Sequence, residues 1–148
     1  MRVNTANICY LLLLLSVVAL IGAYTSGFLG NRDHRTSLIW TDYRRGNPPM
    51  VVRIKDSETG PTPYYVTQGK RSSSGYVVTA QYEQWVATIC ELLPALLNEK
   101  PSEPLAAEMT FSQGTKEWTL RIGKTPSPAS SKLLKAVGDK LPGLDGPP

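Results

Sequence analysis

The sequence predicts an α+β protein in which an N-terminal transmembrane helix precedes a small antiparallel sheet of four to six strands with two helices packed on one face. Three observations favour this class. The 148-residue chain begins with a long uncharged apolar run, several later segments alternate apolar and polar residues, and two segments carry apolar residues at helical spacing. The order is strands, helix, hairpin, helix, without βαβ alternation, so an antiparallel sheet covered on one side is expected.

The first predicted element is a membrane anchor over residues 1–29. No charged side chain lies between Arg2 and Arg32. The densest apolar part, Ile8 to Tyr24, would rise roughly 26 Å as a helix. Continuing the helix to Leu29 makes it long enough to cross the hydrocarbon core of a bilayer.

The alternative to a retained anchor is a signal peptide that is cut off. A secretory signal has a shorter apolar core, with small residues before the cleavage point, and the best position here, after Gly27, is a weak match. We therefore expect a single-pass membrane protein that contacts the bilayer through residues 8–29, with a secreted or periplasmic product as the alternative. Charges flank the run on both sides, so the side on which the domain lies stays open.

The body of the chain is predicted to be a polar juxtamembrane linker at residues 30–36 followed by an α+β domain at residues 37–141. Alternation is clearest at Met50–Lys55, where every second residue is apolar. The Gly/Ser-rich run from Gly69 to Gly75 indicates a flexible hairpin connection. The other strands expected in this part are Ser37–Tyr43, Pro63–Gln68 and a short return at Tyr76–Val78.

The clearest helix of the body follows, with Thr79 as its predicted N-cap. Pro94 lies inside it and lacks the N–H of an unbroken helix, so a kink or a stop near Leu93 is expected. Its apolar positions recur at spacings of three and four and predict the buried face: Tyr82, Trp85, Val86, Ile89, Leu92, Leu93 and Leu96.

The last part of the domain is predicted to be a hairpin and a second helix. Alternating apolar residues on both sides of Gln113-Gly114 predict two strands, with Trp118 roughly opposite Met109. Ser127-Pro128 is typical of a helix start. The residues expected to face the sheet from this helix are Leu133, Leu134, Val137 and Leu141, and the tail at 142–148 is expected to be disordered.

The composition offers little catalytic chemistry. The two cysteines, Cys9 and Cys90, cannot make a disulfide framework, because Cys9 lies in the apolar run. The only histidine, His34, lies beside that run, so Cys90 lacks an evident base and is interpreted as core packing. No cluster has metal-ligand spacing. We expect no cofactor, no metal and no enzyme activity, and an enzyme that uses dispersed carboxylates is the least favoured class.

Four basic residues form the candidate binding site. They fall on two connections that an antiparallel sheet would place at one end, flanked by Tyr43 and Tyr64: Arg44, Arg45, Lys70 and Arg71. Together with a formal charge of +4, such a patch would suit phospholipid headgroups, an acidic protein or a nucleic-acid backbone. The structural alternative, favoured by the loop context, is solvated charge without a ligand.

The sequence thus predicts a membrane-anchored, non-catalytic binding or accessory domain, such as a subunit of a membrane complex. Its partners would be the bilayer and a protein of unknown identity, with no specific nucleic acid. The alternative is a small secreted α+β inhibitor or soluble binding protein, released when the leader is removed.

Overall fold

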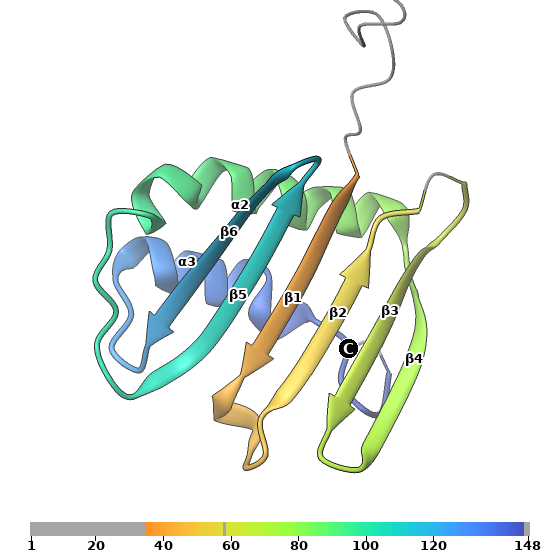
Figure 1. The fold of residues 1–148 in the computed structure, drawn as a ribbon, viewed down its shortest axis with the longest axis horizontal. Helices are drawn as coiled ribbons and strands as arrows, with labels where there is room; N and C mark the ends of the chain where they lie inside the picture. The colour runs from red at the N-terminus through yellow and green to blue at the C-terminus, as the bar shows by residue number, and fades with distance from the viewer. Residues whose placement is uncertain (1–34, 58, 147–148) are drawn as a thin grey trace, which may run out of the picture. The chain divides into compact units, whose positions relative to one another are not determined.

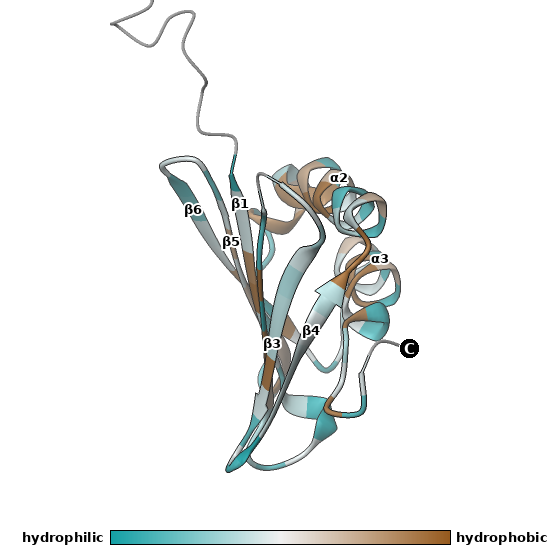
Figure 2. Ribbon diagram, turned by 90° about the vertical axis from the view of Figure 1, so that its right-hand side faces the viewer, coloured by the Kyte–Doolittle hydropathy of each residue, from teal (hydrophilic) through white to brown (hydrophobic). Residues whose placement is uncertain are grey.

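The computed structural model describes residues 35–57 and 59–146, which form a six-stranded antiparallel sheet with two helices on one face (Figures 1 and 2). The predicted α+β class is confirmed. The predicted transmembrane helix lies outside the described residues and stays a prediction. Within the described residues, no helix is long and apolar enough to span a membrane.

The sheet has the strand order β4-β3-β2-β1-β5-β6, with every neighbouring pair antiparallel. The first four strands form a meander, and the long helix then carries the chain behind the sheet so that the fifth strand pairs with the first (Figure 1). The elements are β1 (Thr36–Asp42), a 3₁₀ turn η1 (Tyr43–Arg45), β2 (Met50–Lys55), β3 (Thr62–Gln68), β4 (Arg71–Val77), α2 (Thr79–Leu96), β5 (Leu105–Gln113), β6 (Lys116–Gly123), α3 (Pro128–Ala136) and a second 3₁₀ turn η2 (Gly138–Lys140).

The core lies between the sheet and the helices, as the alternation of the strands requires. On β1, Leu38 and Trp40 are buried against the helices, whereas Ile39 between them points to the other face. The buried face of α2 matches its apolar spacing: Tyr82, Trp85, Ile89, Leu92 and Leu96 are buried, and Val86 and Leu93 are partly buried against the core. The predicted helix face is therefore confirmed.

The segment after α3 packs directly on the central strand. A Cβ atom added at Gly138 would lie 2.6 Å from Cζ2 of Trp40, which is closer than packed carbon atoms approach. Position 138 therefore requires glycine for a steric reason. Leu141 is buried just beyond it, so the chain after α3 closes one end of the core.

Both predictions about the ends of α2 need correction. The N-cap is Val78, without a side-chain cap, and the Oγ1 hydroxyl of Thr79 instead donates to the carbonyl of Gly60 at 3.4 Å. The stop expected near Leu93 is wrong, because the helix continues through Pro94 to Leu96. A proline in the last turn removes little of the hydrogen-bond ladder, and burial of Leu96 holds that turn on the core.

Two strand predictions were also wrong in detail. The Gly69–Gly75 run is not a loop, since the turn contains only Gly69 and Lys70 and β4 begins at Arg71. In the last hairpin Trp118 lies opposite Phe111 rather than Met109, and the two rings stack with centroids 5.8 Å apart. The two-residue turn at Gly114-Thr115 sets this register.

The remaining expectations concern the C-terminal part and Cys90. The helix start is confirmed: Oγ of Ser127 accepts the backbone N–H of Ser130 at 3.1 Å, with Pro128 as the first helical residue. The disorder expected from residue 142 is not observed at 142–146, where Gly143 and Gly146 exchange backbone hydrogen bonds. Cys90 is exposed, so its interpretation as core packing is wrong.

Candidate functional site

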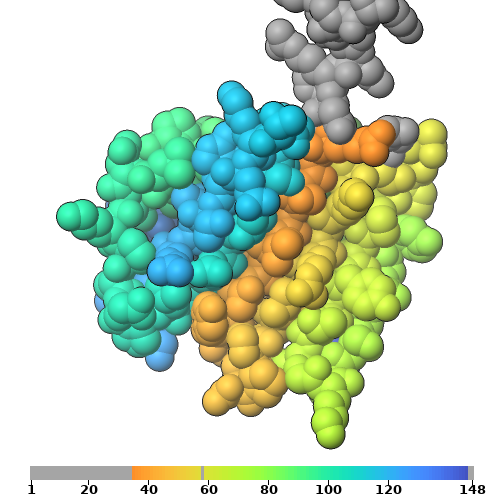
Figure 3. Space-filling view, in the orientation of Figure 1, coloured from red at the N-terminus to blue at the C-terminus, as the bar shows by residue number. Residues whose placement is uncertain are grey.

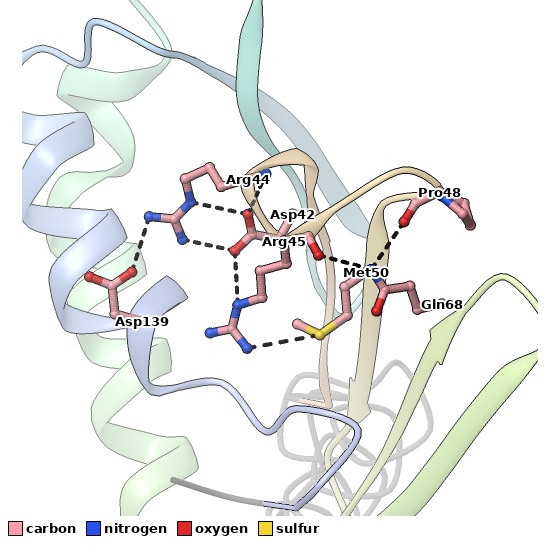
Figure 4. A network of polar contacts seen from close by, with 7 residues as sticks. All are labelled: Asp42, Arg44, Arg45, Pro48, Met50, Gln68 and Asp139. Atoms are coloured by element: carbon pink, nitrogen blue, oxygen red, sulfur yellow. Dashed lines mark hydrogen bonds and ion pairs between the residues drawn. The ribbon is translucent and has the colours of Figure 1, made fainter.

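The two connections that carry the predicted basic patch lie against each other at one end of the sheet. The side chain of Gln68, at the end of β3, donates from Nε2 to the carbonyl oxygens of Arg45 at 2.9 Å and of Pro48 at 3.2 Å (Figure 4). The structure therefore brings the η1 connection and the β3–β4 turn together, as the sequence predicted. The four basic residues of the predicted patch nevertheless differ in their contacts.

Arg44 and Arg45 bind a buried carboxylate, that of Asp42, whose side chain is fully buried (Figure 4). Arg44 donates from Nε at 3.0 Å and from Nη2 at 2.8 Å to the two oxygens of Asp42, and from Nη1 at 3.1 Å to Asp139. Nε of Arg45 lies 3.5 Å from the same carboxylate. The hydrogen bonds that Arg44 donates to Asp42 raise the pKa of Arg44, although partial burial of the guanidinium acts in the opposite direction.

These two arginines therefore have a structural role. A carboxylate at the end of a central strand is costly to bury unless it is paired and hydrogen-bonded, and Asp42 also accepts the backbone N–H of Arg44 at 2.9 Å, capping η1. Lys70 and Arg71 are exposed, and no ion pair joins either of them to another described residue. Half of the predicted patch is thus engaged within the fold.

The face of the sheet opposite the helices carries a second and larger group of candidate residues. None of the helices that the structure describes covers this face, and the strands themselves form the surface (Figure 3). Ile39, Arg53 and Tyr65 form one row across β1, β2 and β3 by direct cross-strand pairing, and Tyr76 of β4 lies opposite Pro63. We define the open-face surface as Ile39, Arg53, Lys55, Pro63, Tyr65 and Tyr76.

The open-face surface exposes large side chains. The exposed fractions are 37% for Ile39, 56% for Tyr65 and 67% for Tyr76. Tyrosine combines a wide apolar ring with a hydroxyl and loses little conformational entropy on binding, which is why it is enriched at interfaces. Exposed tyrosines clustered on one face therefore indicate a binding surface more strongly than the same residues scattered singly.

A depression lies within this surface where β2 and β3 separate. Their pairing ends at Ile54 and Tyr64, and the next residue of β3 towards the loop, Pro63, has no N–H to donate to β2. The resulting hollow has a volume of about 370 Å³ and mostly apolar walls. It is lined by Ser37, Ile39, Arg53, Ile54, Lys55, Pro63, Tyr64 and Tyr65.

The charges of this face divide it into two halves. Across residues 35–57 and 59–146, no carboxylate lies within 4 Å of Arg53 or Lys55. On the other half, Arg121 of β6 pairs with Glu108 of β5 at 3.0 Å. One half therefore presents two cations, without an ion pair to another described residue, beside exposed tyrosines. The other half carries the Arg121–Glu108 pair and a second carboxylate, that of Glu117.

Sequence reasoning missed the open-face surface. In the sequence, Arg53 and Lys55 were interpreted only as the solvent-exposed side of an alternating strand, because most exposed charges on strands arise in this way. The available signal was that Arg53, Lys55 and Tyr65 all lie at positions of their strands that alternation assigns to the solvent side. Only the strand register shows that Arg53 and Tyr65 lie in one row. Tyr64, which the sequence placed beside the basic patch, is buried in the core.

A separate polar cluster joins the loop after α2 to the start of α3. The carboxylate of Glu99 accepts hydrogen bonds from the hydroxyls of Ser127 and Ser130, the latter at 2.6 Å, and Ser102 and Thr125 are 2.8 Å apart nearby. Ser127 also caps α3. These hydroxyls are committed to holding the loop on the helix, so the cluster is structural.

Other chemistry receives little support from the described residues. No group of three or more His, Cys, Asp or Glu side chains in this part of the chain is placed to hold a metal ion. Partial burial raises the pKa of the Cys90 thiol, which lowers the fraction of reactive thiolate at neutral pH.

No known protein family, curated protein or solved structure matches the chain.

Proposed function

We propose that this chain is a non-catalytic binding module, held at a membrane by a single span over residues 8–29, whose open-face surface binds an acidic segment of a protein partner. An accessory subunit of a membrane complex fits this description. The observation that carries the proposal is a pair of cations, Arg53 and Lys55, that no described carboxylate pairs with and that lie beside exposed tyrosines over an apolar depression.

The charges favour an acidic occupant. Arg53 and Lys55 are two residues apart on β2 and point to the same face, so their Cα atoms lie about 6.6 Å apart. That spacing equals the spacing of alternate side chains on an extended peptide. In a peptide that lies flat on the face along β2, carboxylates at every second position would point towards both cations, and the residues between them would point the other way, towards Tyr65 and Pro63 of β3.

The open face supports a protein partner better than a nucleic acid. Aromatic and cationic residues on a sheet also suit single-stranded RNA, whose bases stack on the rings. Here, however, Glu108 and Glu117 lie on the outward positions of β5 and β6. A phosphate backbone that extended across the sheet would meet these carboxylates, whereas a short acidic peptide would stay on the cationic half.

The test uses the full chain in nanodiscs of zwitterionic lipid and a fluorescent peptide of alternating Glu and Val as the probe. We expect binding that weakens as salt rises, and the double variant R53E/K55E should raise Kd at least about tenfold, or about 1.4 kcal/mol. The control K135E/K140E makes the same change of net charge on the helix layer and should leave Kd within about twofold.

Two outcomes would overturn this part of the proposal. One is equal binding by R53E/K55E and the wild-type chain. The other is tighter binding of a uridine-rich single-stranded RNA that the same variant abolishes, which would make the face a nucleic-acid site.

The membrane tether has its own test. The intact mass of the protein from its native source should correspond to the whole chain of 16.2 kDa, and the protein should require detergent for extraction. A soluble product beginning near Phe28 would contradict the tether and favour a secreted binding protein.

A further inference from the structure

We infer that the exposed edge of β4 is a pairing site for a second copy of this chain, so that two sheets join antiparallel through β4 into one continuous sheet. This inference concerns the edge of the sheet and is independent of the proposed function, which concerns its open face. It rests on the backbone of β4, on the contrast between the two edges, and on the residues that self-pairing would place opposite each other.

The β3–β4 hairpin determines which backbone groups of β4 are available. Its loop has two residues, Gly69 with φ of +58° and Lys70, and the pair that closes such a loop, Gln68 and Arg71, is hydrogen-bonded. Hydrogen-bonded and non-hydrogen-bonded pairs then alternate along the ladder. The N–H and C=O groups that point away from β3 therefore belong to Ser72, Ser74 and Tyr76.

The position of proline supports this assignment. Pro63 lies opposite Tyr76, and the alternation makes that pair a non-hydrogen-bonded one. A proline there costs the β3–β4 ladder nothing, because its missing N–H would have pointed away from β4.

The two edges of the sheet differ in their protection. Of the seven residues of β4 only Arg71 is charged, and the strand contains no proline and no bulge in its described ladder. On β6, by contrast, Glu117 and Arg121 occupy outward positions, and Ser102 packs so closely on Gly123 that a Cβ atom there would overlap its backbone. Charges and covering loops are the usual means by which proteins keep a sheet edge from pairing. Among the described residues, β4 has a single charge at one end, Arg71, and no loop packed on its edge as Ser102 is on β6.

Self-pairing centred on Ser74 uses the whole of β4 and avoids like charges. It places Ser72 opposite Tyr76 of the second copy and Arg71 opposite its Val77, with about six backbone hydrogen bonds from the outward groups. The two Arg71 side chains then lie at opposite ends of the paired strands, roughly 20 Å apart.

The second copy would also cover exposed apolar surface. Tyr76 is 67% exposed and Val78, just beyond β4, is 69% exposed; they are among the most exposed large hydrophobic residues of the described part. In the same register Val78 lies opposite Lys70 of the second copy, whose aliphatic stem would cover it. An edge with one charge, at its end, and with exposed apolar side chains beside it fits a copy of itself.

The first experiment tests the register by cross-linking. The full chain in detergent, with Cys9→Ser and Cys90→Ser to remove its own thiols, receives Ser74→Cys. In the proposed dimer the two residues at position 74 face each other with Cα atoms about 5.5 Å apart, within the range of a disulfide. Oxidation should give a cross-linked dimer. The matched control, Thr119→Cys on the outward side of β6, should give no cross-linked dimer.

The second experiment removes the pairing without removing the fold. The protein mass measured by light scattering should be twice 16.2 kDa. Ser74→Pro removes an N–H that the β3 ladder does not use, so it should raise the dimer Kd at least about tenfold while leaving the acidic-peptide binding of the open face intact. Ser74→Lys, which places two ammonium groups together at the two-fold axis, should also raise the dimer Kd at least about tenfold and provides the test of pairing if the proline variant fails to fold. Thr119→Pro and Thr119→Lys are the controls.

Three results would overturn the inference. These are a single-chain mass at tens of micromolar, a dimer whose Kd neither variant at position 74 changes, and a Ser74→Cys chain that cross-links in native membranes to a different protein. The last result would assign the β4 edge to that protein instead.

Discussion

The two faces of the sheet are built from the same strands but differ in how many of their polar and charged side chains have partners within the fold. On the covered face even the charged Asp42 has three hydrogen bonds from Arg44 and lies near Arg45. On the open face Arg53 has no carboxylate partner among the described residues, and Tyr65 is more than half exposed. Groups that a fold satisfies itself maintain structure, so the groups left unsatisfied are where a partner gains most by binding.

The largest expected effect separates the two faces on a single strand. Trp40→Ala removes a fully buried side chain at the centre of β1 and should cost about 3–5 kcal/mol of unfolding free energy. Ile39→Ala, the next residue on the same strand, should cost less than about 1 kcal/mol because its side chain is partly solvated. Urea unfolding followed by circular dichroism measures both. Similar losses for the two variants would mean that the open face is also a packed face.

A smaller effect is expected from the buried charge. Asp42→Asn keeps the shape of the side chain but removes the charge that Arg44 and Arg45 face, and should cost about 2–3 kcal/mol. Asp139→Asn breaks only the outer, half-exposed pair with Arg44 and should cost less than about 1 kcal/mol. Thermal unfolding at neutral pH compares them. Equal costs would show that burial does not strengthen the inner pair.

The smallest expected effect depends on pH. Burial, with a contribution from Asp56, raises the pKa of Tyr82 from 10.0 to about 12, while its hydrogen bond with Thr36, 2.9 Å long, acts in the opposite direction. The folded state therefore holds this proton more tightly than the unfolded state. Its contribution to stability is complete below pH 10 and is lost as pH rises towards 12, by about 2 kcal/mol.

Tyr82→Phe is the matched variant for this prediction. It should lose about 1 kcal/mol at neutral pH, because Thr36 loses its partner, and its unfolding free energy should fall less between pH 10 and pH 12 than that of the wild-type chain. Parallel pH profiles for the two proteins would contradict the assignment to Tyr82.

The sequence predicted the parts of the fold that burial determines. The spacing along α2 identified its buried face, and alternation located β2 and the last hairpin, because apolar residues must leave water in whichever element they form. It failed at β4, where three successive serines show no alternation of apolar and polar residues, although their exposure alternates in the structure. An edge strand is held by backbone hydrogen bonds to a single neighbouring strand. Backbone hydrogen bonds do not require a particular pattern of polar and apolar side chains, so the sequence does not reveal them.

The candidate site was predictable only in part. The basic patch lies where the topology was expected to place it, but the sequence does not show that Asp42 would be buried between the two arginines. The open-face surface depends on which face the helices cover and on the register of three strands, and both are properties of tertiary packing.

The strand order also affects how this domain is made. β1 is the first strand to leave the ribosome, and its neighbour on one side, β2, follows almost at once, but β5, its neighbour on the other side, is translated only at Leu105–Gln113. Until then the growing chain has a central strand with one side unpaired. The final hairpin is therefore the step that completes the pairing of β1, before α3 closes the core, and any stop codon before it would release a product that exposes β1 to aggregation.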